Sequence, residues 1–517
     1  MRRREVSAAA LLALAGCAAP TGVLAPVEDV APGGFRMPPP APREMRGAWI
    51  ATVDNIDWPS RRSLPAAEQR AEMLRMLERA QSIGLNAEML QVRPATDAIY
   101  PSSIEPWSEY LSGEQGRAPE PGWDPLAQWV QEAHRRGIEV HAWFNPYRAW
   151  HPSARGVPAA NHVSRTKPHL VRRYGETQWL DPAEPEAAAQ TLAVVADVLT
   201  RYDIDGVHID DYFYPYPIKG ADGNDVDFPD AAPFQRYLDG GGKLTRDDWR
   251  REQVNVLVRK MFETVRRIRP AARFGISPFG LGRPDLRPPG IEGFSQYDKL
   301  YADVELWVEQ GWYDYLVPQL YWAIDREKQA FAVLQDYWGG RVGKLKHMWP
   351  GLYTSSIPRP GTTPAPTSPN ARNWKADEIL NQIKLQRGHS PAGGHVHFSM
   401  AALMQDRDGI ATKLREQTYR DAVLPPANPW LGGQQPAAPT LRLDGGQLHI
   451  AAAAGSSVTT WAVWLRVAGN WRLRVQPALD TRVALAVEGG TADAVVVTAV
   501  NRSAQESSRV VWRAARG

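Results

Sequence analysis

Two adjacent carboxylates near the middle of the chain, Asp210 and Asp211, are the residues best suited to carry out chemistry. Neighbouring carboxylates disfavour each other's ionisation, so one of them can stay protonated near neutral pH and serve as a general acid. Cleavage of a glycosidic bond is one reaction that needs such an acid. It also needs a second group, either a carboxylate or the substrate's own N-acetyl oxygen, to stabilise the oxocarbenium-like transition state.

A short buried strand is expected to position this pair. In a strand of period two, Gly206, His208 and Asp210 share one face. Val207 and Ile209 pack on the other face. Asp210 would then point inward at the carboxyl end of the strand, which folded cores rarely tolerate without a purpose. The simpler alternative is that the two carboxylates cap the following turn.

Residues 44–423 repeat the order strand then helix, which predicts an α/β fold with a parallel sheet. The expected strands are residues 46–53, 87–93, 138–145, 204–210, 274–278, 315–322, 346–353 and 395–400. Eight strands over roughly 360 residues is the count of a (β/α)8 TIM barrel with long loops. A doubly wound open sheet is the alternative, but no glycine-rich phosphate motif follows the first strand.

Polar and aromatic residues follow the expected strands, at the end where barrel enzymes place their chemistry. Besides the carboxylate pair they are Asp54, Asn55, Trp58, Arg93, Asp97, Asn145, Tyr147, Arg148, Ser277, Gln319, Tyr321, Trp322, Tyr353 and His397. Convergent polar groups among aromatic rings describe a ligand cleft. Taken singly, His141 and His397 are more simply explained as hydrogen-bonded core residues.

The sequence motifs of metal sites, serine hydrolases and nucleotide-binding loops have no match in this chain. The histidines at 134, 141, 151 and 162 lack the spacing of a zinc site, and no cysteine lies near them. Residues 222–227 lack the ligand order and the distal glutamate of an EF-hand. A Gly-x-Ser-x-Gly elbow and a P-loop are both missing. We therefore expect no metal and no cofactor. The interspersed charges, with a net charge of +3, give no indication of nucleic-acid binding.

The amino terminus resembles an export signal with a lipid attachment site. Residues 2–4 are arginines, residues 8–14 are apolar, and Leu14-Ala15-Gly16-Cys17 resembles a bacterial lipobox. Cleavage before Cys17 and acylation of its thiol and amine would anchor the chain in a membrane. Ala18 follows, and by resemblance to lipoproteins of two-membrane bacteria this favours the outer membrane. A secretory signal with an incidental cysteine, or a loosely matched twin-arginine signal, is the alternative.

Composition divides the rest of the chain. Residues 18–43 are rich in Pro, Ala and Gly and predict a tether. Residues 424–439 predict a proline-rich linker, and residues 440–517 carry short alternating runs that predict a small all-β sandwich. This last module weakly resembles a fibronectin type III domain. It would bind wall polymer, brace the barrel or act as a spacer.

Several motifs, in order, resemble the glycosyl hydrolase-like family 10. They are residues 44–52, 55–59, 91–94 with Asp97, 141–148, 179–182, 205–212, 248–251, 276–278 and 318–322. The resemblance covers about residues 44–415. It implies a barrel glycosidase of the bacterial envelope, and the family includes a lipoprotein form that cuts peptidoglycan strands stripped of their stem peptides. The lipobox points to that branch.

Residues 205–212 are also loosely similar to the Asp-Gly-x-Asp-x-Asp-x-Glu motif of family 18 chitinases. His208 stands where that motif has its middle Asp, and Tyr212 stands where it has its terminal Glu. The family's acidic pair places Asp210 and Asp211 in the catalytic role. Our hypothesis is that Asp211 replaces the missing acid and that Asp210 orients a substrate N-acetyl group.

We therefore predict a lipid-anchored glycoside hydrolase of the cell envelope, at the outer membrane and facing the periplasm, that acts on N-acetylated glycan strands of peptidoglycan. The predicted substrate-binding residues are Trp58, Arg93, Trp143, Asn145, Arg148, His208, Ser277, Gln319, Tyr321, Trp322 and His397, of which the three tryptophans are expected to stack on sugars. Two alternatives stay open. One is a glycosidase for another polysaccharide, and the other is a noncatalytic wall-binding lipoprotein.

Overall fold

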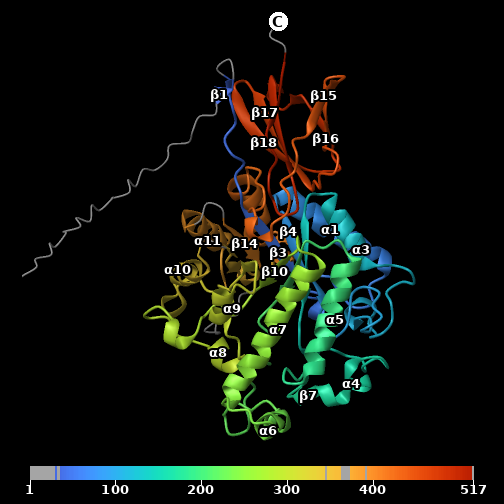
Figure 1. The fold of residues 1–517 in the computed structure, drawn as a ribbon, viewed down its shortest axis with the longest axis vertical. Coiled ribbons are helices and arrows are strands. Elements are labelled where there is room, and N and C mark those ends of the chain that lie inside the picture. Colours follow the sequence, from blue (N-terminus) through green and yellow to red (C-terminus); the bar gives the residue numbers. More distant parts are fainter. Residues whose placement is uncertain (1–29, 32–34, 344–345, 363–372, 390–392, 515–517) are drawn as a thin grey trace, which may run out of the picture. The chain divides into compact units, whose positions relative to one another are not determined.

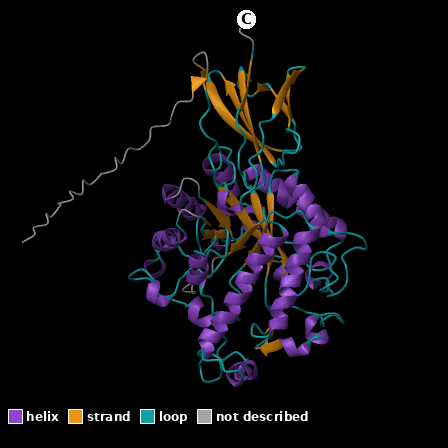
Figure 2. Ribbon diagram, in the orientation of Figure 1, coloured by secondary structure: helices purple, strands orange, loops and turns teal. Residues whose placement is uncertain are grey.

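Parallel strands with mostly buried, largely apolar residues occupy the centre of the structure, surrounded by helices (Figures 1 and 2). The computed structural model describes residues 30–31, 35–343, 346–362, 373–389 and 393–514. The central strands are β3 (Met45–Ile50), β4 (Ala87–Arg93), β5 (Glu139–Phe144), β9 (Gly206–Ile209), β10 (Arg273–Ile276), β11 (Tyr315–Leu316), β12 (His347–Met348), β13 (Gly351–Leu352) and β14 (Gly394–His397).

These strands close into a barrel. Their order is β12-β11-β10-β9-β5-β4-β3-β14-β13, and every neighbouring pair is parallel. The two outermost strands, β12 and β13, are halves of one strand that Pro350 interrupts, because proline cannot donate a ladder hydrogen bond. A bridge between Gln319 and Gly351 joins the sixth strand to the seventh. The predicted (β/α)8 TIM barrel is therefore confirmed.

Amphipathic helices cover the barrel with their apolar faces inward. They are α1 (Ala66–Ile83), α3 (Pro125–His134), α5 (Pro185–Arg201), α7 (Arg246–Ile268), α9 (Val304–Gln310), α10 (Phe331–Val342), α11 (Ala376–His389), α12 (Met400–Met404) and α13 (Ile410–Lys413). Gly84, with φ +85°, ends α1 in the left-handed conformation that glycine adopts at little cost. The side chain of Thr245 accepts the N–H of Asp248 and so caps the start of α7.

The connections that follow the barrel strands carry extra elements. These are α2 (Glu109–Ser112), α4 (Val163–Thr166), α6 (Ala231–Asp239), α8 (Gln296–Lys299) and the antiparallel sheet of β6 (Arg148–Trp150), β7 (Val171–Tyr174) and β8 (Thr177–Leu180). Because each lies after a strand, they surround the carboxyl-terminal end of the barrel. Loops at this end form the active sites of barrel enzymes.

The carboxyl-terminal residues form two antiparallel sheets. One contains β15 (Thr440–Asp444), β16 (Gln447–Ala451) and β19 (Arg482–Ala484), and the other contains β18 (Asn470–Pro477), β17 (Thr460–Val467), β22 (Ala494–Val500) and β23 (Val510–Arg513). A short pair, β20 (Ala486–Val487) and β21 (Gly490–Thr491), lies apart from both. Side chains from both sheets share one apolar core. The predicted small all-β domain is confirmed, while its likeness to a fibronectin type III domain stays a prediction.

Little of the predicted export signal and tether is described. Cys17 and the rest of residues 1–29 lie outside the described residues. In the tether, β1 (Val30–Ala31) and β2 (Phe35–Arg36) pair antiparallel. Within the described parts of the chain, no helix has the length and apolar character needed to cross a bilayer.

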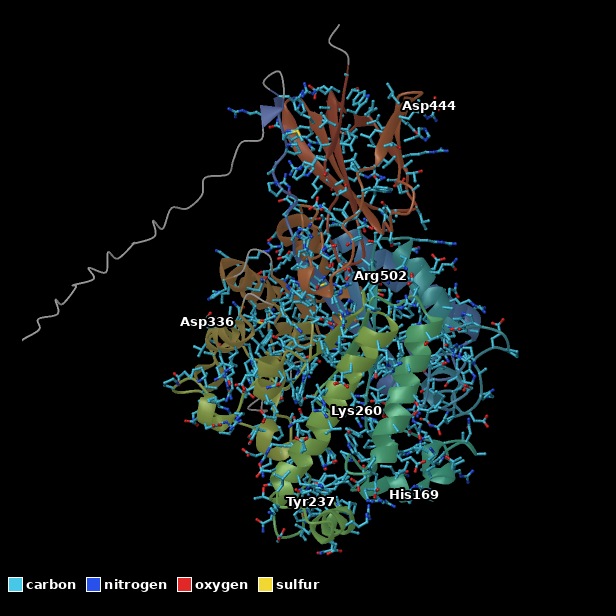
Figure 3. The ribbon with its side chains drawn as sticks, viewed as in Figure 1. His169, Tyr237, Lys260, Asp336, Asp444 and Arg502 are labelled. Carbon is cyan, nitrogen blue, oxygen red and sulfur yellow. The ribbon has the colours of Figure 1, made fainter. Side chains whose placement is uncertain are left out.

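The linker and the all-β domain bind the amino-terminal end of the barrel. The indole of Trp430 donates to a carboxylate oxygen of Asp314, just before β11, at 2.9 Å. Arg502, in the connection between β22 and β23 and labelled in Figure 3, donates to Asp205 Oδ1 at 2.8 Å and to Asp203 Oδ2 at 2.7 Å. Both aspartates directly precede β9, the strand that leads to the carboxylate pair. These contacts favour bracing among the three roles considered for this domain.

Replacing Arg502 by Ala is therefore expected to lower the free energy of unfolding by about 3 kcal/mol, because buried Asp205 loses its guanidinium partner. Urea unfolding followed by tryptophan fluorescence measures the change. Arg442→Ala is the control, since Arg442 pairs with Asp444 on an exposed surface and its loss should change little. Equal midpoints for Arg502→Ala and the native chain would contradict a bracing role.

Candidate active site

A pocket of about 260 Å³ lies at the carboxyl-terminal end of the barrel. Its lining residues come from all parts of the barrel: Trp49, Ala51, Val53, Ile56, Gln91, Trp143, Arg148, His151, Asp210, Asp211, Tyr212, Tyr216, Ser277, Gln319, Tyr321, Tyr353 and Phe398. Both members of the carboxylate pair are among them. The strand β9 ends at Ile209, so it delivers the pair directly to the pocket.

Each carboxylate has its own hydrogen-bond donors. The side-chain amide of Asn145 donates to both oxygens of Asp210, at 2.8 and 2.6 Å. The hydroxyl of Tyr216 donates to Asp211 Oδ2. Asp210 is 4% exposed and Asp211 is 2% exposed, so neither carboxylate is well solvated. Donors to both oxygens of Asp210 and to Oδ2 of Asp211 leave the two side chains little freedom to move.

Burial makes this pair retain a proton at unusually high pH. Burial raises the pKa of Asp210 to about 7, against the opposing effect of the Arg148 guanidinium and with support from the negative charge of Asp211. Burial also raises the pKa of Asp211, although hydrogen bonds from Tyr216 and Gln319 lower it. Near neutral pH the pair therefore shares a proton, as acid catalysis of glycoside cleavage requires.

The pH dependence of kcat/KM should reveal this proton. The two carboxyl groups hold one proton between them, and as the pH rises through about 7 the pair loses it, so that Asp211 has no proton to donate. We therefore expect kcat/KM to fall about tenfold per pH unit above that point. Asn145→Ala removes donors that stabilise the Asp210 carboxylate, so the alkaline limb should move to higher pH. A limb that stays in place in this variant would show that Asp210 does not contribute to it.

Five further predicted residues line the pocket: Trp143, Arg148, Ser277, Gln319 and Tyr321. Asn145 lies behind them and orients Asp210. Arg148 donates to Asn145 Oδ1 at 2.9 Å, and its guanidinium lies 4.2 Å from the centre of the Tyr212 ring. Arg148 thus orients the amide that holds Asp210, while a face of the same side chain reaches the pocket.

Two predicted binding residues are structural instead. Trp58 is fully buried, donates its indole N–H to the carbonyl of Gln69 at 3.0 Å and packs edge-on against Trp129. The loop after β3 thus brings this tryptophan against α1, where it is part of the core. Arg93 is also fully buried and forms a two-pronged ion pair with Glu105, at 2.8 and 2.6 Å. Neither side chain lines the pocket, and both predictions are wrong on this point.

Three other predicted residues lie outside the lining. Trp322 is half-buried and packs against Phe279 in the core. His397 is fully buried and contacts the hydroxyl groups of Thr354 and Tyr419, each at 2.8 Å. His208 lies beneath the pocket and not in its wall. Trp322 follows β11, whereas His208 lies within β9 and His397 is the last residue of β14. None of the three lines the pocket.

An aromatic wall lines the pocket, and sequence reasoning proposed Tyr321 and Tyr353 for the cleft but missed Phe398 and Trp49. Tyr321 stacks on Tyr353 with ring centres 4.7 Å apart and 23° between the planes. The ring centre of Phe398 lies 5.7 Å from that of Tyr321. The other aromatic lining residues are Trp49, Trp143, Tyr212 and Tyr216. For Trp49 a signal was present, because period two places it on the same inward face as Ala51. Flat aromatic faces of this kind suit the apolar faces of sugar rings.

The residues that the structure describes offer no cluster of metal ligands beside this pocket. Across the described ranges of the chain, no three His, Cys, Asp or Glu side chains come together as metal ligands. The arrangement provides a buried acid pair, donors that orient it and an aromatic wall.

Comparisons with known proteins agree with this chemistry. The model of the family "Glycosyl hydrolase-like 10" matches residues 44–367. The chain is 39% identical over 407 residues to glycosyl hydrolase YngK of Bacillus subtilis (strain 168), covering 77% of this chain and 76% of that protein. It is 35% identical over 367 residues to glycosyl hydrolase DigH of Escherichia coli (strain K12), covering 66% of this chain and 80% of that protein.

Among solved structures, the catalytic domain of β-amylase from Paenibacillus polymyxa superimposes with a TM-score of 0.46 at 10% identity, over 74% of this chain and 99% of that one. The family match begins at the first residues of the barrel and includes the carboxylate pair and most of the pocket. Because that match spans well over half of the chain, the protein belongs to the glycosyl hydrolase-like 10 family and is a glycoside hydrolase.

Proposed function

We propose that this glycosidase cleaves the N-acetylated glycan strands of peptidoglycan after their stem peptides have been removed. The observation that carries the proposal is the buried pair Asp210 and Asp211 in an aromatic pocket. Asp211 donates its proton to the glycosidic oxygen as the bond from that oxygen to C1 breaks. Asp210 orients the acetamido group, whose carbonyl oxygen bonds to C1. Water then attacks C1 as the bond from C1 to the acetamido oxygen breaks, which restores the acetamido group, and the water returns a proton to Asp211.

The small volume of the pocket supports a peptide-free substrate. About 260 Å³ holds a sugar ring with its acetamido group, but a stem peptide on the same sugar would have to fit between the walls. Asp210 and Asp211 are almost fully enclosed, so a sugar must enter deeply to reach them. Removal of the peptides by an amidase would allow this entry.

The proposed location is the periplasmic side of the outer membrane, with Cys17 as the lipid attachment site. The support is the lipobox sequence that ends at Cys17. Cys17→Ser should move the protein from the membrane fraction to the soluble fraction of a two-membrane host. An unchanged distribution between the fractions would contradict the anchor.

Digestion of peptidoglycan tests the substrate. The soluble form that lacks residues 1–17 is incubated with amidase-treated and untreated sacculi, and the products are identified by mass spectrometry. We expect fragments of whole disaccharides from amidase-treated sacculi only. Equal release from both would contradict the requirement for peptide-free strands. No release from either, with activity on another polysaccharide, would assign the enzyme to that glycan.

A further inference from the structure

A chain of hydrogen-bonded side chains runs inside the barrel beneath the pocket. Its contacts are Trp49 Nε1 to His208 Nε2 at 3.0 Å, His208 Nδ1 to Tyr315 Oη at 3.1 Å, Tyr315 Oη to His141 Nδ1 at 2.6 Å, and His141 Nε2 to Glu139 Oε2 at 3.4 Å. The two histidines and Tyr315 are completely buried. The proposed catalytic steps do not use this chain, so its role needs a separate explanation.

The contact with Trp49, at the end of the chain nearest the pocket, determines which ring nitrogen of His208 carries the proton. An indole N–H can only donate, so Nε2 of His208 accepts from Trp49 and carries no proton. A neutral imidazole then has its proton on Nδ1, and this N–H donates to the oxygen of Tyr315. The single phenolic proton of Tyr315 is left to donate to Nδ1 of His141.

The contact between His141 and Glu139, at the far end of the chain, requires the protons to point in the same direction. The carboxylate of Glu139 forms an ion pair with Arg273 at 2.5 Å, so it acts as an acceptor. Nε2 of His141 must therefore carry the proton that it directs at Glu139. Nδ1 of His141 is then free to accept from Tyr315. Burial lowers the pKa of both histidines, which agrees with one proton on each ring.

Two glycines make room for the chain. A Cβ atom on Gly206 would lie 2.5 Å from Nδ1 of His141, and a Cβ atom on Gly275 would lie 1.9 Å from the ring of Tyr315. Any larger residue at either position would push these rings out of line. Gly206 belongs to the same four-residue strand as His208.

We propose that His208 is a positioning residue, held as the neutral Nδ1–H tautomer, that fixes the indole of Trp49 and the hydroxyl of Ser277 in the pocket. Ser277 Oγ lies 3.2 Å from the same unprotonated Nε2, and both Trp49 and Ser277 line the pocket. Because Nε2 has no proton to give, Ser277 can only donate its hydroxyl proton to it. The lone pairs of Ser277 Oγ therefore stay available to a donor on the substrate. Such a donor is the acetamido N–H or a hydroxyl of an uncharged sugar.

Nitrogen NMR of protein labelled with 15N-histidine and 15N-tryptophan tests the tautomer directly and needs no substrate. His208→Gln and His141→Gln assign the two ring signals. We expect His208 as Nδ1–H and His141 as Nε2–H, both unchanged between about pH 5 and 8. A His208 ring that carries its proton on Nε2, or that becomes cationic in this range, would overturn the proposal.

Kinetics test the positioning, with peptide-free glycan as substrate, and this arm rests on the proposed function. His208→Leu removes the acceptor for Trp49 and should raise KM about tenfold with a smaller effect on kcat. His208→Gln keeps an acceptor oxygen and should recover most of the loss. Ser277→Ala should raise KM by a similar factor. His395→Leu, which removes a buried imidazole from β14, controls for general destabilisation.

The NMR experiment and the kinetic experiment can fail independently of each other. If the glycan is not a substrate, the NMR result and the Trp49 indole signal, assigned with Trp49→Phe, still decide the tautomer and the contact. The indole N–H signal should shift in His208→Leu and stay near its native position in His208→Gln. A native KM in a folded His208→Leu variant, or an unshifted indole signal, would overturn the positioning role.

Discussion

Replacing Asp211 by Asn should lower kcat on glycan strands by about a thousandfold, because the leaving oxygen loses its proton donor. The side chain keeps its shape, and Tyr216 can still donate to the amide oxygen. Asp210→Asn should cost a similar factor through loss of the charge that orients the acetamido group. Release of reducing ends from amidase-treated sacculi measures both effects.

An activated substrate separates the two roles. An aryl N-acetylglucosaminide has a leaving group that departs without protonation, so it should restore much of the rate in Asp211→Asn but not in Asp210→Asn. Asp54→Asn is the control. Asp54 is exposed, lies outside the pocket lining and has a φ of 55°, which Asn tolerates. If Asp211→Asn keeps near-normal turnover on glycan strands, Asp211 is not the acid.

Replacing Arg93 by Met should lower the free energy of unfolding by about 3–5 kcal/mol, because it leaves the Glu105 carboxylate buried without its partner. Arg93 also donates to the carbonyl of Asn145 at 2.6 Å, so the support for Asp210 weakens as well. Urea unfolding and kcat on the glycan are the measurements. We expect both to decrease, with little change in KM.

The double variant Arg93→Met, Glu105→Leu is the matched comparison. Removing both charges should recover a large part of the lost stability, since the cost comes from the unpaired carboxylate. Lys328→Met, which breaks an exposed pair with Glu292, should change nothing measurable. A stable Arg93→Met variant with a raised KM would instead restore the prediction that Arg93 binds sugar.

The predicted strands agree best with the structure where local pattern alone determines the element. The second expected strand coincides with β4 at residues 87–93. The sixth was expected over residues 315–322, but β11 ends at Leu316, and Pro318 lies just beyond it. The seventh is divided at Pro350 for the same reason. Proline at these places indicates shorter strands, because it cannot donate a ladder hydrogen bond.

For the site residues, the sequence predicted which side chains share a strand face but not which of them reach the pocket. Period two correctly placed His208 and Asp210 on one face of β9, but it could not say how far along that face the pocket extends. Asp210 lines the pocket, whereas His208 lies one layer below it. Trp58 and Trp322 follow strands just as Asp210 does, yet Trp58 is buried in the core and Trp322 packs against the core. Loop paths depend on packing with distant segments, which sequence spacing does not contain.

Local periodicity and residue type were thus enough to predict the eight-stranded barrel, the acidic pair at the end of its fourth strand and the separate all-β domain. Both sources of information act over a few residues, where backbone geometry controls which side chains share a face. Only the tertiary structure decided which residues meet in the pocket, which side chains join His208 in a hydrogen-bonded chain, and that Arg502 contacts Asp203 and Asp205 just before β9. These outcomes depend on contacts between residues that lie far apart in the sequence, and folding alone brings those residues together.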